Sequence, residues 1–244
     1  MTLKEYYDMF KEQSCINIEE SLKETHSYSP LLGKNKAFCD EYDKWISILE
    51  GRTETYIYRN AIKAYQEAYS NMLMGLYQPA YMGLRYFLER SLMGVYFSAS
   101  EIEMLTWKAG ERDTYWTELV GVEDKNNSPN EANKGIYSAK FTRAFFREFE
   151  PVRSNFLQQT KTVYRDCSVY VHGNPSAIDK LGEKFEYNEE LADLWNNYAD
   201  TVARCILYAF MLRYWKILAP EQKDIVRDRL FEEFSSTDTI KDFL

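Results

Sequence analysis

The chain has 244 residues, 45% of them hydrophobic, and carries 30 lysines and arginines against 38 aspartates and glutamates, a formal net charge of −8. This length and hydrophobic content suit one domain with a substantial core and exclude general disorder. The acidic balance argues against a protein that coats nucleic acid by bulk electrostatic attraction, although it leaves room for a local basic site.

Helical periodicity dominates the first half of the chain. Residues 1–50 contain shorter helical segments around the loop SYSPLLGKN, and we expect them to form an N-terminal helical extension. Apolar residues recur every three or four positions from Thr55 to Met74, and Gly75 is placed to end that helix. Pro79 is placed to begin the next one.

The second half shows the same periodicity, interrupted by the clearest loop of the chain, EDKNNSPNEANKG. Strand signals are nearly absent. The sequence therefore predicts an all-α fold, a helical bundle over residues 51–244 with the extension at residues 1–50. Its later helices are expected near 135–150, from about 152 to His172, from about 188 to 216, and from Pro220 to Phe234, before a fraying tail, SSTDTIKDFL.

The spacing of the cysteines and the lack of a long apolar stretch predict a cytoplasmic location. Cys15, Cys39, Cys167 and Cys205 are too far apart in sequence for a zinc or redox pair, and the last two lie in apolar stripes typical of buried, reduced thiols. The longest apolar stretch, CILYAFML at 205–212, is too short to cross a bilayer. The first residues, MTLKEYYDMFKEQ, lack an apolar signal core. We expect a cytoplasmic protein with no membrane association, no metal and no cofactor.

One predicted helix, PVRSNFLQQTKTVYRDCSVYVHGN at 151–174, combines a core face with chemically useful side chains. At 100° per residue, its core stripe consists of Phe156, Val163, Cys167, Tyr170 and Val171. Arg165 and His172 are seven residues apart, so they share the opposite face to within about 20°. His172 lies in the last turn before Gly173. Imidazole is the side chain best suited to give or take a proton near neutral pH.

Arg165 and His172 are separated by about 10 Å along the helix axis, which is awkward for one active site within one chain. Two copies of this helix packed antiparallel about a two-fold axis would bring Arg165 of one copy to His172 of the other. If the site is catalytic, its geometry therefore favours a homodimer.

Arg165, Asp166 and His172 resemble the signature of the HEPN superfamily of all-α ribonucleases. That signature is an arginine, usually followed by a polar residue, and a histidine after about four to six intervening residues. Here six residues intervene and Asp166 follows the arginine. The surrounding VYRDCSVYVHGN also resembles HEPN helices, and AYMGLRYFLERSLMGVYF is similar to the family's other core helix. The resemblance covers about residues 55–215.

The resemblance implies a metal-independent RNA endonuclease. His172 would act as general base on a ribose 2′-hydroxyl or as acid to the leaving oxygen, and Arg165 would hold the scissile phosphate. Asp166 would orient Arg165 or a substrate hydroxyl. DNA lacks the 2′-hydroxyl, so the expected substrate is RNA. Family members generally act as dimers, and many serve as toxins or in antiphage defence. The expected partners are therefore RNA, a second copy, and an antitoxin or defence-system protein.

Several neighbouring residues are assigned supporting roles around this site. We assign substrate binding to Lys161, Ser168, Arg153 and Asn174, and support of the site to Tyr170 and to Arg85 and Glu89, which lie one turn apart and can pair. Residues 140–172 carry six basic and three acidic side chains, a net charge of +3, against −11 for the remainder. A basic patch on an acidic body suits a small phosphate-binding cleft.

Other interpretations stay open. HEPN members without catalytic activity exist, so the alternative is a non-catalytic helical subunit that binds a partner protein or a nucleotide. The 20 tyrosines could stack on bases, but at helical spacing we expect most of them in the core. The second histidine, His26 in KETHSYSP, is expected at the surface near a turn, without a functional role.

Overall fold

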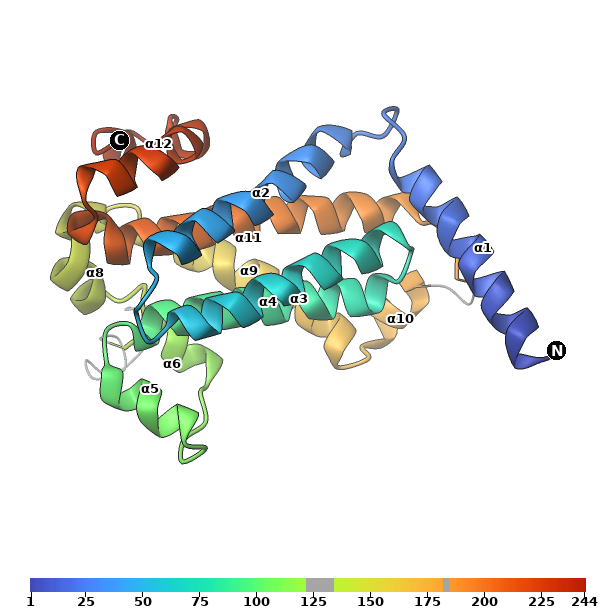
Figure 1. The fold of residues 1–244 in the computed structure, drawn as a ribbon, viewed down its shortest axis with the longest axis horizontal. Helices are drawn as coiled ribbons and strands as arrows, with labels where there is room; N and C mark the ends of the chain where they lie inside the picture. Colours follow the sequence, from blue (N-terminus) through green and yellow to red (C-terminus); the bar gives the residue numbers. More distant parts are fainter. Residues whose placement is uncertain (122–133, 182–184) are drawn as a thin grey trace.

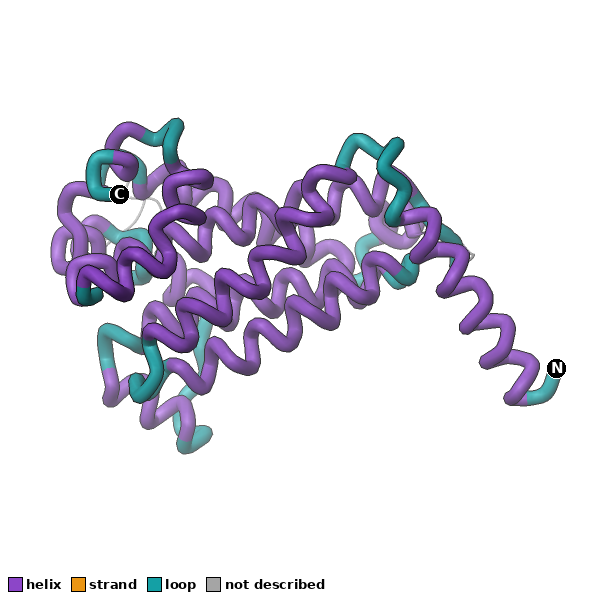
Figure 2. Tube along the Cα trace, turned by 45° about the horizontal axis from the view of Figure 1, so that its top comes forward, coloured by secondary structure: helices purple, strands orange, loops and turns teal. Residues whose placement is uncertain are grey.

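The computed structural model describes residues 1–121, 134–181 and 185–244, and these ranges contain helices and no strand (Figure 2). The predicted all-α fold is therefore confirmed. The α-helices are α1 (Leu3–Ser21), α2 (Ser29–Ile48), α3 (Thr55–Leu73), α4 (Tyr77–Phe97), α5 (Glu101–Lys108), α6 (Trp116–Val120), α8 (Ala139–Phe146), α9 (Arg153–Val171), α10 (Pro175–Leu181), α11 (Glu189–Tyr214), α12 (Pro220–Phe234) and α13 (Asp238–Lys241). Short 3-10 helices, η1 (Arg147–Phe149) and η2 (Trp215–Ile217), continue α8 and α11.

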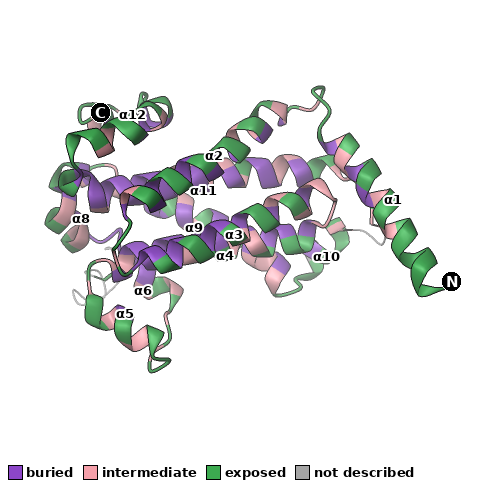
Figure 3. Ribbon diagram, viewed as in Figure 1, coloured by how far each residue is buried: buried purple, intermediate pink, exposed green. Residues whose placement is uncertain are grey.

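The helices α2, α3, α4, α9 and α11 lie side by side and form the bundle (Figure 1). The helix α11 contacts α2, α4 and α9, and its residues Cys205–Leu212 are all buried (Figure 3). A helix that is apolar all round is a core helix, so this packing accounts for the longest apolar stretch of the sequence. None of the described helices combines the length and the apolar composition that crossing a bilayer requires.

The predicted helix ends are close to the observed ones. Helix α3 ends at Leu73, and Gly75 has a φ of +80°, a conformation that a residue with a Cβ adopts with difficulty. Helix α4 begins at Tyr77, two residues before Pro79. Proline is tolerated there because the first turn of a helix needs no backbone N–H donor.

Buried tyrosines make up much of the core, as the helical spacing predicts. Ten of the 20 tyrosines are buried, and several of their hydroxyls form hydrogen bonds inside the bundle, whereas the Tyr208 hydroxyl has no hydrogen-bond partner in the described part of the chain. The hydroxyls of Tyr58 and Tyr214 lie 2.8 Å apart, and the Tyr81 hydroxyl donates to the Leu191 carbonyl at 2.9 Å. Such bonds offset the cost of removing a phenolic hydroxyl from water.

The cysteines Cys167 and Cys205 are buried, as their place in apolar stripes predicts. Burial raises the pKa of the Cys205 thiol to about 12. The two side chains lie in the bundle core among apolar neighbours, so they act as small hydrophobic residues there.

The first fifty residues divide into two differently packed helices. Helix α2 packs within the bundle, with Phe38, Tyr42 and Trp45 fully buried. Helix α1 instead leans away from the bundle (Figure 1). It is attached at its C-terminal half, where Asn17 Nδ2 donates to the Met74 carbonyl at 2.9 Å. Of the expected extension, α1 is therefore the part that stands apart from the bundle.

The expected surface position of His26 is wrong, since its side chain is only 8% exposed. The imidazole stacks on Tyr28 with ring centroids 5.1 Å apart, and Nδ1 lies 3.2 Å from Glu189 Oε1. Its Nε2 lies 2.9 Å from the Glu20 carbonyl oxygen. His26 thus fastens the turn between α1 and α2 to the beginning of α11.

The C-terminal tail is more ordered than the sequence predicts. It forms α13, in which Ile240 is fully buried, and the Phe243 ring packs edge-on to Phe146 with centroids 5.0 Å apart. These two apolar side chains cover η1 and the end of α12, so tertiary packing stabilises a segment that its local composition does not.

Two helical glycines, Gly94 and Gly33, provide a matched test of the packing of α4 against α3. A Cβ at Gly94, in α4, would overlap the ring of Tyr58, whereas a Cβ at Gly33, in α2, would have no other atom within 4 Å. We expect Gly94→Ala to destabilise the fold by about 1–3 kcal/mol, because the buried Tyr58 has little room to move. Gly33→Ala is expected to stabilise it by about 0.5–1 kcal/mol, because alanine favours the helix and restricts the unfolded chain.

Denaturant unfolding of both variants measures these changes. Equal effects of the two substitutions would contradict the close contact between α4 and α3 at Gly94.

Candidate functional site

The helix α9 ends where the sequence predicts. Gly173 has a φ of +61°, and the Asn174 N–H donates to the Val169 carbonyl at 3.0 Å, the bond that closes a Schellman motif. Pro175 then begins α10, and the Asn174 carbonyl accepts the Ala177 N–H at 2.9 Å. This tight connection holds His172 at the exposed end of α9 with the chain turning sharply behind it.

The two faces of α9 are separated as expected. Phe156, Val163, Cys167 and Tyr170 are buried, whereas Val171, predicted in the same stripe, is only half-buried. On the opposite face the Arg165 side chain is 72% exposed, and His172 is exposed. The described chain therefore leaves this face of α9 accessible at both residues.

Arg165 is held in place by a chain of polar contacts. Its Nε donates to Asp166 Oδ1 at 2.9 Å, and the Tyr198 hydroxyl of α11 donates to Asp166 Oδ2 at 3.0 Å. Burial, followed by the hydrogen bond to Asp166, raises the pKa of Tyr198, so this phenol remains a donor at neutral pH. Asp166 thus links the exposed guanidinium to the core helix. This arrangement fits the orienting role that the resemblance implies for Asp166.

Three of the expected substrate-binding residues lie near Arg165 and His172. Lys161 is half-buried one turn before Arg165. Ser168 lies between Arg165 and His172 in sequence, and its Oγ donates to the Tyr164 carbonyl. Asn174 is in the turn directly after His172. They distribute ammonium, hydroxyl and amide groups along α9 and the turn after it, from one turn before Arg165 to just beyond His172.

Arg153 lies apart from this group. It is the first residue of α9, about 18 Å along the helix axis from Arg165. Its Nη1 donates to the Tyr137 carbonyl at 3.0 Å. Within one chain, Arg153 therefore supports the connection before α8 and is too far away to share a phosphate with Arg165.

Arg85 does not pair with Glu89 in the described part of the chain. Its Nη2 lies 2.5 Å from the Tyr164 hydroxyl, and its guanidinium carbon is 4.5 Å from the centre of that ring. Tyr164 also stacks on Trp116, with centroids 3.6 Å apart. Arg85 therefore fixes a ring on α9 one residue before Arg165 and supports the site through Tyr164.

The basic residues of segment 140–172 are spread along the bundle. Helix α8, with Lys140 and Arg143, lies at the opposite end of the bundle from α10, which follows His172 (Figure 1). Arg143 pairs with Glu150, and Glu148 pairs with Lys216 at 2.7 Å. Of the basic residues of this segment, Lys161 and Arg165 are therefore the ones close to the candidate site.

A pocket of about 160 Å³ lies beside Asp166, between α9, α10 and α11. Tyr170 and Tyr198 form its aromatic wall, and Lys180 lies at its edge. Sequence periodicity assigns Tyr198 an inward position on its helix but cannot indicate that its hydroxyl reaches a carboxylate 32 residues away. No group of three or more histidine, cysteine or acidic side chains that could hold a metal occurs within the described ranges.

Comparison of the chain with known protein families, curated proteins and solved structures finds no match.

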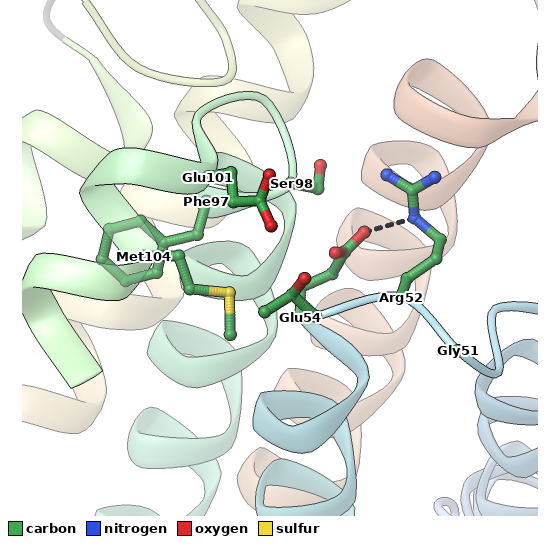
Figure 4. A pocket seen from close by; sticks show the side chains of 8 residues that line it. Gly51, Arg52, Glu54, Phe97, Ser98, Glu101 and Met104 are labelled. Carbon is green, nitrogen blue, oxygen red and sulfur yellow. Dashed lines mark hydrogen bonds and ion pairs between the residues drawn. The ribbon is translucent and has the colours of Figure 1, made fainter.

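A second polar cluster, which the sequence does not predict, lies at the end of the bundle opposite α10 (Figure 1). Figure 4 shows Arg52 and Glu54 of this cluster. The cluster borders a pocket of about 300 Å³ where the α2–α3 turn meets the end of α4. Glu54, only 3% exposed, accepts hydrogen bonds from Arg52 Nε at 2.5 Å and from the Tyr214 hydroxyl at 2.9 Å. Arg213 Nε donates to Ser98 Oγ at 2.8 Å.

These contacts join three separate elements of the fold. Burial, followed by the neighbouring Glu54 carboxylate, raises the pKa of Tyr214, and burial lowers the pKa of Arg213. The acceptors are backbone and side-chain groups of the α2–α3 turn and of the end of α4. The cluster therefore connects the α2–α3 turn and the end of α4 to the end of α11, and we interpret it as a structural network.

Proposed function

We propose that the chain is a metal-independent RNA endonuclease that works as a homodimer. Its composite site would combine Arg165 of one copy with His172 of the other. The observation that carries the proposal is the exposed guanidinium of Arg165, oriented by Asp166 and Tyr198 on the same helix face as the exposed His172.

The chemistry follows from these side chains. Arg165 can form paired hydrogen bonds with two phosphate oxygens and stabilise the charge that develops there during the reaction. His172 can take the proton of a ribose 2′-hydroxyl or protonate the leaving 5′-oxygen. Asp166 and Tyr198 reduce the motion of Arg165, so less entropy is lost when the phosphate binds.

The dimer supplies what one chain lacks. Arg165 and His172 are about 10 Å apart along α9, whereas the reacting groups of one phosphodiester must be contacted together. Because the outer face of α9 is exposed at both residues, a second copy can pack against it antiparallel.

The biological setting proposed here comes from the HEPN resemblance: a cytoplasmic toxin or antiphage ribonuclease, controlled by an antitoxin or defence-system protein. Fold-level likeness alone does not specify a target. Cellular RNAs cleaved on expression of the chain would identify it.

A second candidate function, a non-catalytic subunit that binds a partner protein, is favoured by α1. This helix leans away from the bundle (Figure 1). Its exposed apolar side chains include Leu3, Tyr7, Met9 and Ile16. Exposed apolar side chains on a helix that stands apart from its bundle are typical of protein–protein contact sites.

Incubation of the purified protein with mixed cellular RNA in EDTA distinguishes the two functions. We expect cleavage that survives EDTA and falls by about 10²-fold or more in His172→Ala and in Arg165→Ala. Gln159→Ala, on an adjoining part of α9, serves as the control and should cleave normally. Absence of cleavage under every condition, including extracts of phage-infected cells, would favour the partner-binding subunit.

A further inference from the structure

The pocket beside Asp166 has walls suited to a flat aromatic ligand. Tyr170 stacks on Tyr81 with ring centroids 4.1 Å apart and planes 8° from parallel. Tyr198 meets the same Tyr81 edge-on at 6.3 Å. Leu194 and Ala177 complete an apolar side of the pocket. The volume of about 160 Å³ is of the order of a single nucleobase and is too small for a whole nucleotide.

Asp166 is the acidic residue in the lining of this pocket. Its two oxygens accept one hydrogen bond each, from Arg165 Nε and from the Tyr198 hydroxyl. A carboxylate oxygen has two acceptor positions, so each oxygen keeps one for a ligand. The side chain is 27% exposed, so part of it is accessible to a ligand.

We propose that this pocket receives one base of the RNA substrate and selects guanine. The inference rests on the proposed function, because it makes the pocket the base-specificity site of that ribonuclease. Guanine presents two adjacent donors, N1–H and N2–H, which match the two oxygens of one carboxylate. Adenine and cytosine place an acceptor nitrogen beside their amino group, and uracil has a single N–H between two carbonyl groups, so each opposes an acceptor to Asp166.

The same carboxylate connects base recognition with the phosphate site. Asp166 bonds directly to Arg165, so a base held at Asp166 places its phosphate near the guanidinium. Lys180 lies at another edge of the pocket, where its Nζ is 3.1 Å from Glu190 Oε1. Base and phosphate would thus be bound by neighbouring groups, as the dimensions of one nucleotide require.

Calorimetric titration with the 3′-monophosphates of guanosine, adenosine, cytidine and uridine tests the proposal independently of cleavage. We expect guanosine 3′-monophosphate to bind about tenfold more tightly than the other three, since two charge-assisted hydrogen bonds distinguish it. Asp166→Asn should remove this preference, because an amide offers one donor and one acceptor. Asp179→Asn, an exposed aspartate of α10 outside the pocket, should retain it.

Two further variants separate the possible failures. Val169→Phe narrows the pocket without altering the carboxylate and should weaken guanosine 3′-monophosphate binding. Gln159→Ala, at a position of α9 outside the pocket, should bind it normally. Equal affinities for the four nucleotides, no binding at all, or a preference that survives Asp166→Asn would overturn the guanine pocket. A guanine preference without RNA cleavage would instead refute the ribonuclease and leave the base pocket standing.

Discussion

An equimolar mixture of Arg165→Ala and His172→Ala chains is expected to recover about a quarter of the wild-type RNA cleavage, although each variant alone is nearly inactive. In a composite site, a mixed dimer pairs the intact Arg165 of one copy with the intact His172 of the other. About half of randomly assorted dimers are mixed, and each contains one functional site of two. The measurement is cleavage of labelled RNA in EDTA after subunit exchange.

The chain carrying both substitutions provides the matched control. When it is exchanged with wild-type chain, a mixed dimer has no complete composite site, so activity should fall more steeply than the fraction of wild-type chain. If each chain contained its own complete site, the mixture of single variants would stay inactive. A protein that is strictly monomeric by gel filtration would also refute the composite arrangement.

The second large effect, on the stability of the fold, is expected at the buried cluster around Glu54. Glu54→Ala should lower the free energy of unfolding by about 3–5 kcal/mol, because it leaves Arg52 and the Tyr214 hydroxyl without their shared acceptor. Urea unfolding measures the change, and RNA cleavage below the unfolding transition should be retained because the cluster lies far from His172.

Glu50→Ala is the control for that substitution. Glu50 is close to Glu54 in sequence and also pairs with an arginine, Arg59, but its side chain is 61% exposed. An exposed ion pair contributes little, so its loss should change stability by no more than about 0.5 kcal/mol. Comparable losses in the two variants would contradict the structural role assigned to Glu54.

Much of the helical framework follows from local sequence. The end of α9 is an example: Gly173 supplies the positive φ, Pro175 begins the next helix, and His172 must therefore lie in the last turn. The shared face of Arg165 and His172 follows from the helical repeat alone. Local rules fail at the C-terminal tail, where burial of Ile240 stabilises a short helix that propensity does not predict.

The partners of the site residues could not be predicted in the same way. Arg85 bonds to Tyr164 on another helix instead of to Glu89 one turn away, and Asp166 receives the hydroxyl of Tyr198. The spacing of residues along one helix predicts which of its own side chains can contact one another. It carries no information on which side chain of a neighbouring helix will arrive there.

The sequence by itself determined the all-α class, the ends of the main helices and the face that Arg165 and His172 share, because turn residues and the 3.6-residue repeat act locally. Tertiary structure alone decided the support of Arg165 by Asp166 and Tyr198, the base-sized pocket beside them, and the contact of Arg85 with Tyr164. Those features depend on how α9, α10 and α11 pack, and packing is set by the fit of many side chains at once.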